Sequence, residues 1–226
     1  MELTPSQSQQ ITEVEREVKK ILSDSEAGHD WWHIQRVYSC AQRICQVEKG
    51  NQFVIYLAAL LHDIADSKFH DGDESIGPEL AQKIMTAYEV DTDVQNHVIQ
   101  IIRHMSFKNS FGKQEFTSRE MKIVQDADRL DAIGAIGIAR AFSYGGYKGR
   151  VFMDPSIAPI SHVDKSSYTK STAPTINHFY EKLLLLKDQM HSEYAKQLAE
   201  ERHQFMLLYL NQFYNCLLYT SPSPRD

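Results

Sequence analysis

The segment that most constrains the fold is LAALLHDIAD, residues 57–66. Its first five residues are all apolar, and His62 and Asp63 follow them directly. A helix that is apolar all round must be buried in the centre of a protein. Burying an imidazole beside a carboxylate is costly unless the two groups are paired or bind a metal ion. Both groups are good ligands for first-row divalent metals, and the partial negative charge at a helix C-terminus favours a cation there. For the dipeptide alone, a pair that merely caps the helix end is the simpler interpretation.

Composition narrows the class of protein and its partners. The 226 residues are 42% hydrophobic and 24% charged, and they contain only seven prolines and ten glycines, which favours a helix-rich globular protein. The net charge is −6 and no segment is strongly basic, so duplex nucleic acid is not an expected partner. A small phosphate ester, in contrast, needs only a local cationic pocket.

The sequence favours a cytoplasmic setting. Residues 1–20 are polar and mixed in charge, so we expect no secretory signal. No apolar run approaches the roughly 18 residues that a membrane span needs, so no membrane contact is expected. The three cysteines, Cys40, Cys45 and Cys216, lack CxxC spacing and suggest a reducing compartment.

Apolar residues recur at helical spacing along most of the chain, which predicts the all-α class. The expected helices cover residues 6–23, 30–50, 53–65, 75–88, 91–104, 117–131, 175–191 and 193–215. Asp30 is the expected N-cap of the second helix, and Thr117 with Glu120 can form a capping box. Residues 132–142 are small and apolar and suit close helix packing, whereas residues 143–174 are expected to form a long loop.

The last segment, CLLYTSPSPRD, shares no pattern with the preceding residues. It resembles the translation of a sequencing-library adaptor, so residues 216–226 are interpreted as a non-native tail. A natural disordered end is the alternative. Residues 1–215 are accordingly treated as a single domain.

Metal-binding side-chain types occur on three of the expected helices. They are His33, the His62–Asp63 pair, and an aspartate of DADRLD, which is Asp126, Asp128 or Asp131. Three acids within six residues of a partly apolar helix are costly unless they are charge-paired or bind metal. Mixed nitrogen and oxygen ligands suit Mn, Fe, Co, Ni, Zn or Mg. A histidine at the edge of an apolar stripe, as His33 is, more often belongs simply to the core, and periodicity alone does not bring the three helices together.

Four segments in order, GHDWWHIQRV, LAALLHDIAD, VQDADRLDAIGAIGIAR and INHFYEKLLLLKDQM, resemble signatures of the HD-domain metal-dependent phosphohydrolase superfamily, in its YedJ/YpgQ-like bacterial branch. The resemblance covers residues 5–215 and implies an HD-domain helical bundle with an additional C-terminal helical pair. It further implies a metal held by His33, His62, Asp63 and Asp128. Asp128 is preferred over Asp126 because it is the aspartate of ADRL. Asp126 either orients a ligand or lies on the helix surface.

The resemblance also implies a catalytic apparatus around that metal. Four protein ligands leave positions on an octahedral ion for a water and a phosphate oxygen, and Mn²⁺ is the first expectation among Mg²⁺, Co²⁺, Ni²⁺, Fe²⁺ and Zn²⁺. Asp63 thus has a catalytic role, and Asp66 stands where relatives often have a glutamate that handles the proton. An ordinary loop carboxylate is the alternative for Asp66. Candidate groups for binding substrate phosphate are Lys68, Arg103, His104, Arg129, His178 and Lys182, although each alone is more typical of a surface charge.

The implied activity is hydrolysis of a nucleotide or related small phosphate ester. Within the branch, the sharper expectation is a nucleoside triphosphate pyrophosphohydrolase, in which water attacks the α-phosphorus and a monophosphate and pyrophosphate are released. The alternatives are a phosphomonoesterase or cyclic-nucleotide phosphodiesterase of the same superfamily, and a non-catalytic metal-bound nucleotide sensor. Exposed apolar helix faces would be compatible with a homodimer.

Overall fold

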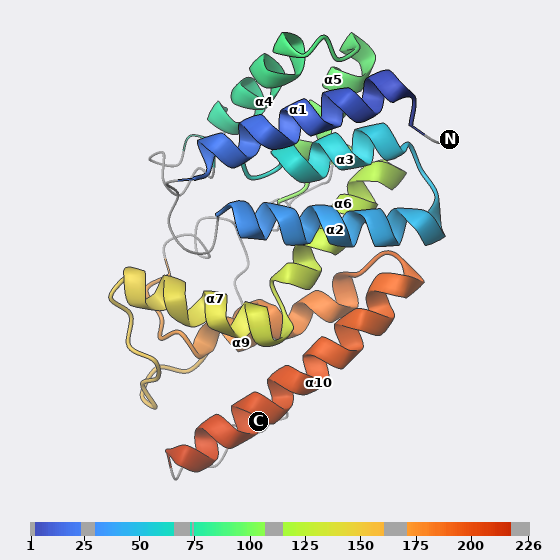
Figure 1. The fold of residues 1–226 in the computed structure, drawn as a ribbon. Helices are drawn as coiled ribbons and strands as arrows, with labels where there is room; N and C mark the ends of the chain where they lie inside the picture. Colours follow the sequence, from blue (N-terminus) through green and yellow to red (C-terminus); the bar gives the residue numbers. More distant parts are fainter. Residues whose placement is uncertain are drawn as a thin grey trace. The chain divides into compact units, whose positions relative to one another are not determined.

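The structure is a computed structural model that describes residues 3–23, 30–65, 73, 75–106, 115–160 and 171–217 (Figure 1). Within these ranges every regular element is a helix. The predicted all-α class is therefore confirmed.

The chain divides into two compact units. The first comprises Met1–Asp128 with Ser161–Thr172, and the second comprises Arg129–Ile160 with Ala173–Asp226. The boundary after Asp128 falls inside helix α6 (Arg119–Asp131), which begins in the first unit and ends in the second. The single domain expected over residues 1–215 stays a prediction.

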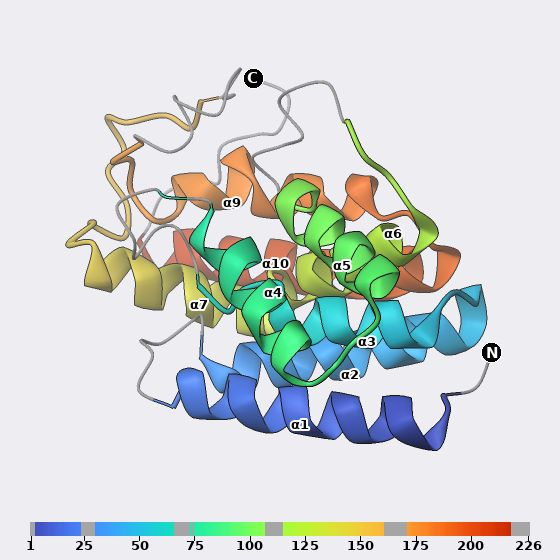
Figure 2. The ribbon, with the colours of Figure 1, turned by 90° about the horizontal axis from the view of Figure 1, so that it is seen from above.

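The first unit is organised around a short central helix. It contains α1 (Pro5–Ile21), α2 (Trp31–Glu48), α3 (Gln52–Leu61), α4 (Ile76–Ala87) and α5 (Thr92–His104). Helix α3 packs against α1, α2 and α5, and α2 runs antiparallel to it (Figures 1 and 2). Every residue of α3 from Phe53 to Leu61 is buried, as its all-apolar sequence predicts.

Side-chain caps fix where the helices of this unit begin. The Asp30 side chain accepts a hydrogen bond from the backbone N–H of His33, which confirms the predicted cap of α2. Asn51 caps α3 in the same way through the N–H groups of Phe53 and Val54. Helix α3 ends at Leu61 rather than near residue 65, so His62 forms the first residue beyond it.

The start of α6 differs from its prediction. The helix begins at Arg119, and the Ser118 hydroxyl accepts the backbone N–H of Met121. The Glu120 carboxylate accepts the backbone N–H of Asn51 instead of closing a capping box with Thr117. The capping-box prediction is wrong because Glu120 binds a residue distant in the sequence.

The second unit contains α7 (Gly134–Tyr147), α9 (Asn177–Glu181), the 3₁₀ helix η3 (Leu183–Gln189) and α10 (Glu193–Cys216). Helix α7 packs against α10, and η3 packs against α9 and α10. Rings from three of these elements cluster at centroid distances of 6.0–6.1 Å. The clustered residues are Phe142, Phe179, Tyr209 and Phe213.

Two helix boundaries in this unit differ from those predicted from the sequence. Helix α7 continues through Tyr147, so the loop expected from residue 143 begins later. The helix expected over residues 175–191 is split at Lys182, whose φ of −144° is not helical, and the chain continues as η3. In η3 the buried residues Leu183 and Leu186 are three positions apart, which matches the three-residue period of a 3₁₀ helix.

The C-terminal end of the last helix also differs from its prediction. Cys216, expected to begin the non-native tail, is the last residue of α10. Residues 218–226 lie outside the described residues. None of the helices described here is both long enough and apolar enough to cross a membrane.

Two neighbouring glycines of α7 provide a test of the packing. A Cβ on Gly145 would lie 2.2 Å from the hydroxyl oxygen of buried Thr175, whereas a Cβ on Gly146 would meet nothing within 4 Å. We expect Gly145→Ala to lower the free energy of unfolding by about 1–3 kcal/mol, because the short threonine side chain cannot move away cheaply. Gly146→Ala is the matched control, and urea denaturation should place it within about 0.5 kcal/mol of the parent protein or above it. Equal stability of the two variants would contradict this packing.

Candidate metal centre

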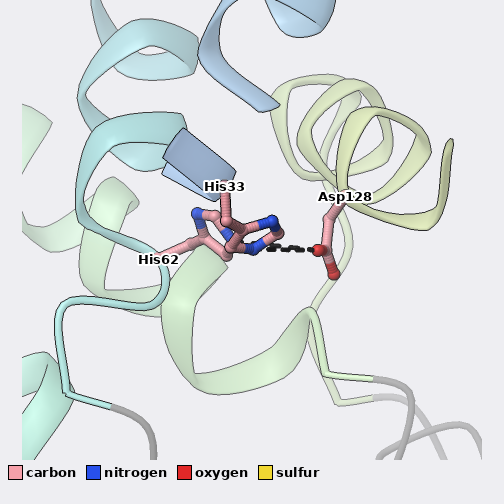
Figure 3. A group of neighbouring side chains, drawn as sticks. All are labelled: His33, His62 and Asp128. Atoms are coloured by element: carbon pink, nitrogen blue, oxygen red, sulfur yellow. Dashed lines mark hydrogen bonds and ion pairs between the residues drawn. The ribbon is translucent and has the colours of Figure 1, made fainter. Parts of the chain in front are cut away.

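Four side chains of the first unit converge where three helices meet. His33 lies in the first turn of α2, His62 and Asp63 directly follow α3, and Asp128 lies in the last turn of α6. Figure 3 shows the side chains of His33, His62 and Asp128 pointing toward one another. The structure therefore brings together the residues that the resemblance implies as ligands.

The Nε2 atom of His33 is the centre of this cluster. It lies 3.3 Å from Nε2 of His62, 3.6 Å from Oδ2 of Asp63 and 3.6 Å from Oδ1 of Asp128. The same carboxylate oxygen of Asp128 lies 3.8 Å from Nε2 of His62. The ligand atoms of His33, His62 and Asp128 all lie within 4.8 Å of one another.

A backbone contact orients the His62 ring. Its Nδ1 atom lies 2.9 Å from the carbonyl oxygen of Ala59, and a carbonyl can only accept, so Nδ1 carries the donated proton. This orientation points Nε2 toward the cluster, as a metal-binding histidine requires. The Ala59 contact was not predicted from the sequence, although a histidine directly after a helix is well placed to reach the carbonyl three residues earlier.

The spacing fits ligands of one ion better than it fits hydrogen bonds. Ligand atoms about 2.1 Å from a metal lie about 3 Å apart at adjacent positions and about 4.2 Å apart at opposite positions. The four distances, 3.3 to 3.8 Å, fall within this range and exceed ordinary hydrogen-bond lengths. A proton on Nε2 of His33 could form a hydrogen bond with only one of these neighbours at a time. A metal ion, in contrast, can bind all of the surrounding donor atoms together. The residues therefore fit a divalent cation.

Burial of the four side chains is uneven. The side chains of His33 and His62 are 1% and 4% exposed, whereas those of Asp63 and Asp128 are 22% and 37% exposed. The two imidazoles thus form the closed side of the centre, and the carboxylates face its accessible side. Any further ligand, such as a water or a substrate oxygen, would enter beside the carboxylates.

The three acids of DADRLD have different surroundings. Asp128 joins the cluster, Asp126 is fully buried in the same helix, and Asp131 forms a 2.7 Å ion pair with Arg140 in the second unit. The structure thus favours Asp128 over the other two as a metal ligand. A role for Asp126 in orienting a ligand stays a prediction.

The predicted substrate-binding residues are distributed over both units. Asp66 and Lys68 lie outside the described residues. At the end of α5, Arg103 is exposed and the His104 ring lies 5.9 Å from that of Phe116. Substrate contacts by either residue stay predictions.

In the second unit, the predicted substrate-binding residues lie at the end of α6, in α9 and directly after α9. Arg129 donates to the carbonyl oxygen of Gln189 and lies 3.1 Å from Nε2 of His191. His178 is half-buried in α9, and Lys182 lies beyond the end of that helix. Substrate binding by these three residues stays a prediction.

Comparison with known proteins places these motifs in a family. The HD domain family model matches residues 31–133, which include all four residues of the cluster. YpgQ of Bacillus subtilis is 40% identical over 205 residues, covering 90% of this chain and 91% of that protein. The chain belongs to the HD domain family. Together with the matching signatures, the similarity to YpgQ places it in the YpgQ-like branch.

Solved structures of HD relatives have the same fold. A protein of Lactobacillus plantarum is 37% identical, with a TM-score of 0.85 and coverage of 96% of this chain and 99% of that chain. An HD-superfamily hydrolase of Bacillus thuringiensis is 41% identical, with a TM-score of 0.72 and coverage of 95% and 100%. YpgQ in complex with ADP is 34% identical, with a TM-score of 0.72 and coverage of 98% and 100%. This HD protein is accordingly a metal-dependent hydrolase.

Metal binding should stabilise the folded chain through this cluster. We expect Mn²⁺ to raise the free energy of unfolding by about 2.7 kcal/mol at a hundredfold excess over its Kd, because the converging donors exist only in the folded state. Differential scanning fluorimetry of chelator-treated protein with increasing Mn²⁺ measures the shift. The double variant His62→Ala, Asp63→Ala should show none.

The matched control is His97→Gln. His97 is also a half-buried histidine near a carboxylate, 3.7 Å from Glu120, but it lies outside the cluster. This variant should keep the full Mn²⁺-dependent shift. A shift that persists in the double variant would place the bound metal elsewhere.

Proposed function

We propose that the chain is a phosphohydrolase of nucleotides, and specifically that it converts a nucleoside triphosphate and water into a monophosphate and pyrophosphate. The observation that carries the proposal is the cluster of two imidazoles and two carboxylates, whose nitrogen and oxygen atoms lie 3.3–3.8 Å apart and whose accessible side is formed by the carboxylates. Such a centre suits attack of water on a phosphate ester.

In this proposal each residue of the cluster has a distinct part. His33 and His62 bind the cation from the buried side, and the Ala59 carbonyl keeps the His62 ring in the binding tautomer. Asp63 and Asp128 supply negative charge and border the position where the phosphate would lie. When bound, the divalent ion lowers the pKa of a water and polarises the phosphate.

A nucleotide is the proposed substrate because of the relative that binds one. The crystal structure of YpgQ contains ADP, and this chain covers all of that structure's chain at 34% identity. The proposed substrate is a triphosphate, whose cleavage by water at the α-phosphorus would release a monophosphate and pyrophosphate. Preference for a base or a sugar would appear as a difference in hydrolysis rate among the nucleotides.

Mn²⁺ is the proposed cation. The donors are imidazole nitrogen and carboxylate oxygen, with no cysteine in the cluster, and this mixture suits octahedral first-row ions.

The proposed location is the cytoplasm. The three cysteines are free thiols, which supports a reducing compartment.

Proton handling and charge neutralisation are assigned to residues around the cluster. Asp66 follows Asp63 by three residues and is the proposed group that accepts a proton from the attacking water. Lys68, Arg103, His104, Arg129, His178 and Lys182 remain the candidates for contacting the phosphates.

A product-resolved hydrolysis screen tests the proposal. Metal-stripped protein is resupplied with Mn²⁺ and incubated with ribo- and deoxyribonucleoside mono-, di- and triphosphates, and phosphate and pyrophosphate are assayed separately. We expect Mn²⁺-dependent release of pyrophosphate from triphosphates. The His62→Ala, Asp63→Ala variant should lose at least a thousandfold in kcat/KM, because it removes half of the ligand set.

The other outcomes separate the rival functions. Free phosphate from monophosphates would indicate a phosphomonoesterase, and hydrolysis of added cyclic nucleotides a phosphodiesterase. Tight binding of metal and nucleotide without turnover would indicate a sensor. Turnover that survives in the double variant would show a contaminating enzyme.

The role of Asp66 makes a separate prediction. Asp66→Asn removes the proton acceptor while keeping the size of the side chain, so kcat should fall about 10²- to 10⁴-fold. The Mn²⁺-dependent stabilisation and the Kd for nucleotide should stay within about twofold of the parent values, since Asp66 is not a proposed ligand. Steady-state kinetics and calorimetry measure the two effects. Normal turnover in Asp66→Asn would remove the residue from the mechanism.

A further inference from the structure

Asp128, a proposed metal ligand, lies near the C-terminal end of its helix. Helix α6 ends at Asp131, three residues later, so Asp128 belongs to the final turn. The last four carbonyl groups of a helix lack partners within it, and helix ends fray. A frayed turn would leave the Asp128 carboxylate disordered, and it would then be a poor ligand.

Arg202, on helix α10, caps this end of α6. Its guanidinium donates a hydrogen bond to the carbonyl oxygen of Leu130. That oxygen also accepts the backbone N–H of Ile133 at 3.3 Å, and the Arg129 carbonyl accepts the N–H of Ala132 at 3.2 Å. Arg202 thus supplies a side-chain partner for the buried C-terminal end of α6, where the helix dipole favours a cation.

The backbone directly after α6 leaves room for the Arg202 side chain at Gly134. Gly134 has a φ of +74°, and a Cβ there would lie 3.0 Å from Cγ of Arg202. A glycine therefore leaves room for the aliphatic part of the arginine beside the turn that follows α6.

Two further arginines act on the same helix end. Arg140 of α7 pairs with Asp131 at 2.7 Å, and the Asp131 side chain is only 6% exposed. Arg129, the residue after Asp128, donates to the carbonyl oxygen of Gln189 in η3. The final turn of α6 is consequently bound by side chains or backbone of three elements of the second unit.

We propose that Arg202 is a positioning residue of the metal centre: by capping α6 it orders the final turn and holds the Asp128 carboxylate in the orientation that binds the cation. The inference rests on the proposed function only in that the cluster binds a divalent cation. It does not depend on which substrate is hydrolysed, because it concerns the affinity of the free protein for metal.

The test is Mn²⁺ binding by the metal-stripped full-length chain, measured by isothermal titration calorimetry and by the electron paramagnetic resonance signal of free Mn²⁺. Arg202→Ala should raise the Kd for Mn²⁺ about tenfold, as expected when support for a ligand is lost. Arg202→Lys keeps a cation at the helix end and should recover part of the affinity.

Two controls separate positioning from general destabilisation. Lys187→Ala removes the 2.9 Å ion pair with Glu200 in the same unit, and it should leave the Kd within twofold. Leu210→Ala deletes a buried apolar side chain of α10 about 12 Å along the helix axis from Arg202, and it should lower the Tm without changing the Kd. Hydrogen exchange of the amides of residues 130–133 should quicken in Arg202→Ala but not in Leu210→Ala.

Each outcome bears on a defined claim. An unchanged Kd in Arg202→Ala overturns the inference, and so does an equal rise of the Kd in Leu210→Ala. A parent protein that binds no Mn²⁺ overturns the inference together with the proposed function. A selective rise of the Kd in Arg202→Ala, in a protein that hydrolyses no nucleotide, supports the inference and refutes the proposed function alone.

Discussion

The structure depends on bringing four electron-pair donors together at the end of a buried helix. Two imidazole nitrogens and two carboxylate oxygens lie within 3.3–3.8 Å of a neighbouring donor, and one of the imidazoles, that of His33, is fully buried. Without a cation, this grouping would cost free energy through desolvation and through repulsion between the carboxylates. With a cation, the same atoms form a binding site. The apolar helix α3 makes this arrangement effective, because packing on every side leaves the residues at its end little freedom.

The features of the site that could be predicted are those that depend on residues close together in the sequence. His62 and Asp63 follow an apolar run whose burial is evident from its composition, and the Asp30 cap that begins α2 fixes the turn that carries His33. Their convergence with Asp128 was implied only by resemblance, because helical spacing does not say which helices meet. The structure supports that convergence by geometry.

What could not be predicted depends on contacts between distant residues. Glu120 was expected to close a capping box, but it binds the backbone of Asn51, 69 residues away in the sequence. A loop was expected from residue 143, yet helix α7 continues through Gly145 and Gly146 to Tyr147, and Gly145 allows close packing on Thr175. The leucine run after Lys182 has the composition of an α-helix but forms a 3₁₀ helix, in which its buried leucines face one side. In each case tertiary packing outweighs local propensity.

The four donors are not equivalent, and this difference has a chemical consequence. His33 lies in the first turn of α2, and His62 and Asp63 directly follow α3, so all three are held by elements of the first unit. Asp128 is the most exposed donor, and the three residues that follow it in α6 belong to the second unit and are bound by other residues of that unit. The position of Asp128 therefore depends on the ordering of a helix end, unlike the positions of the other three donors. Because Asp128 also borders the accessible side, the order of that helix end influences both the affinity for the cation and the shape of the space where a phosphate would bind.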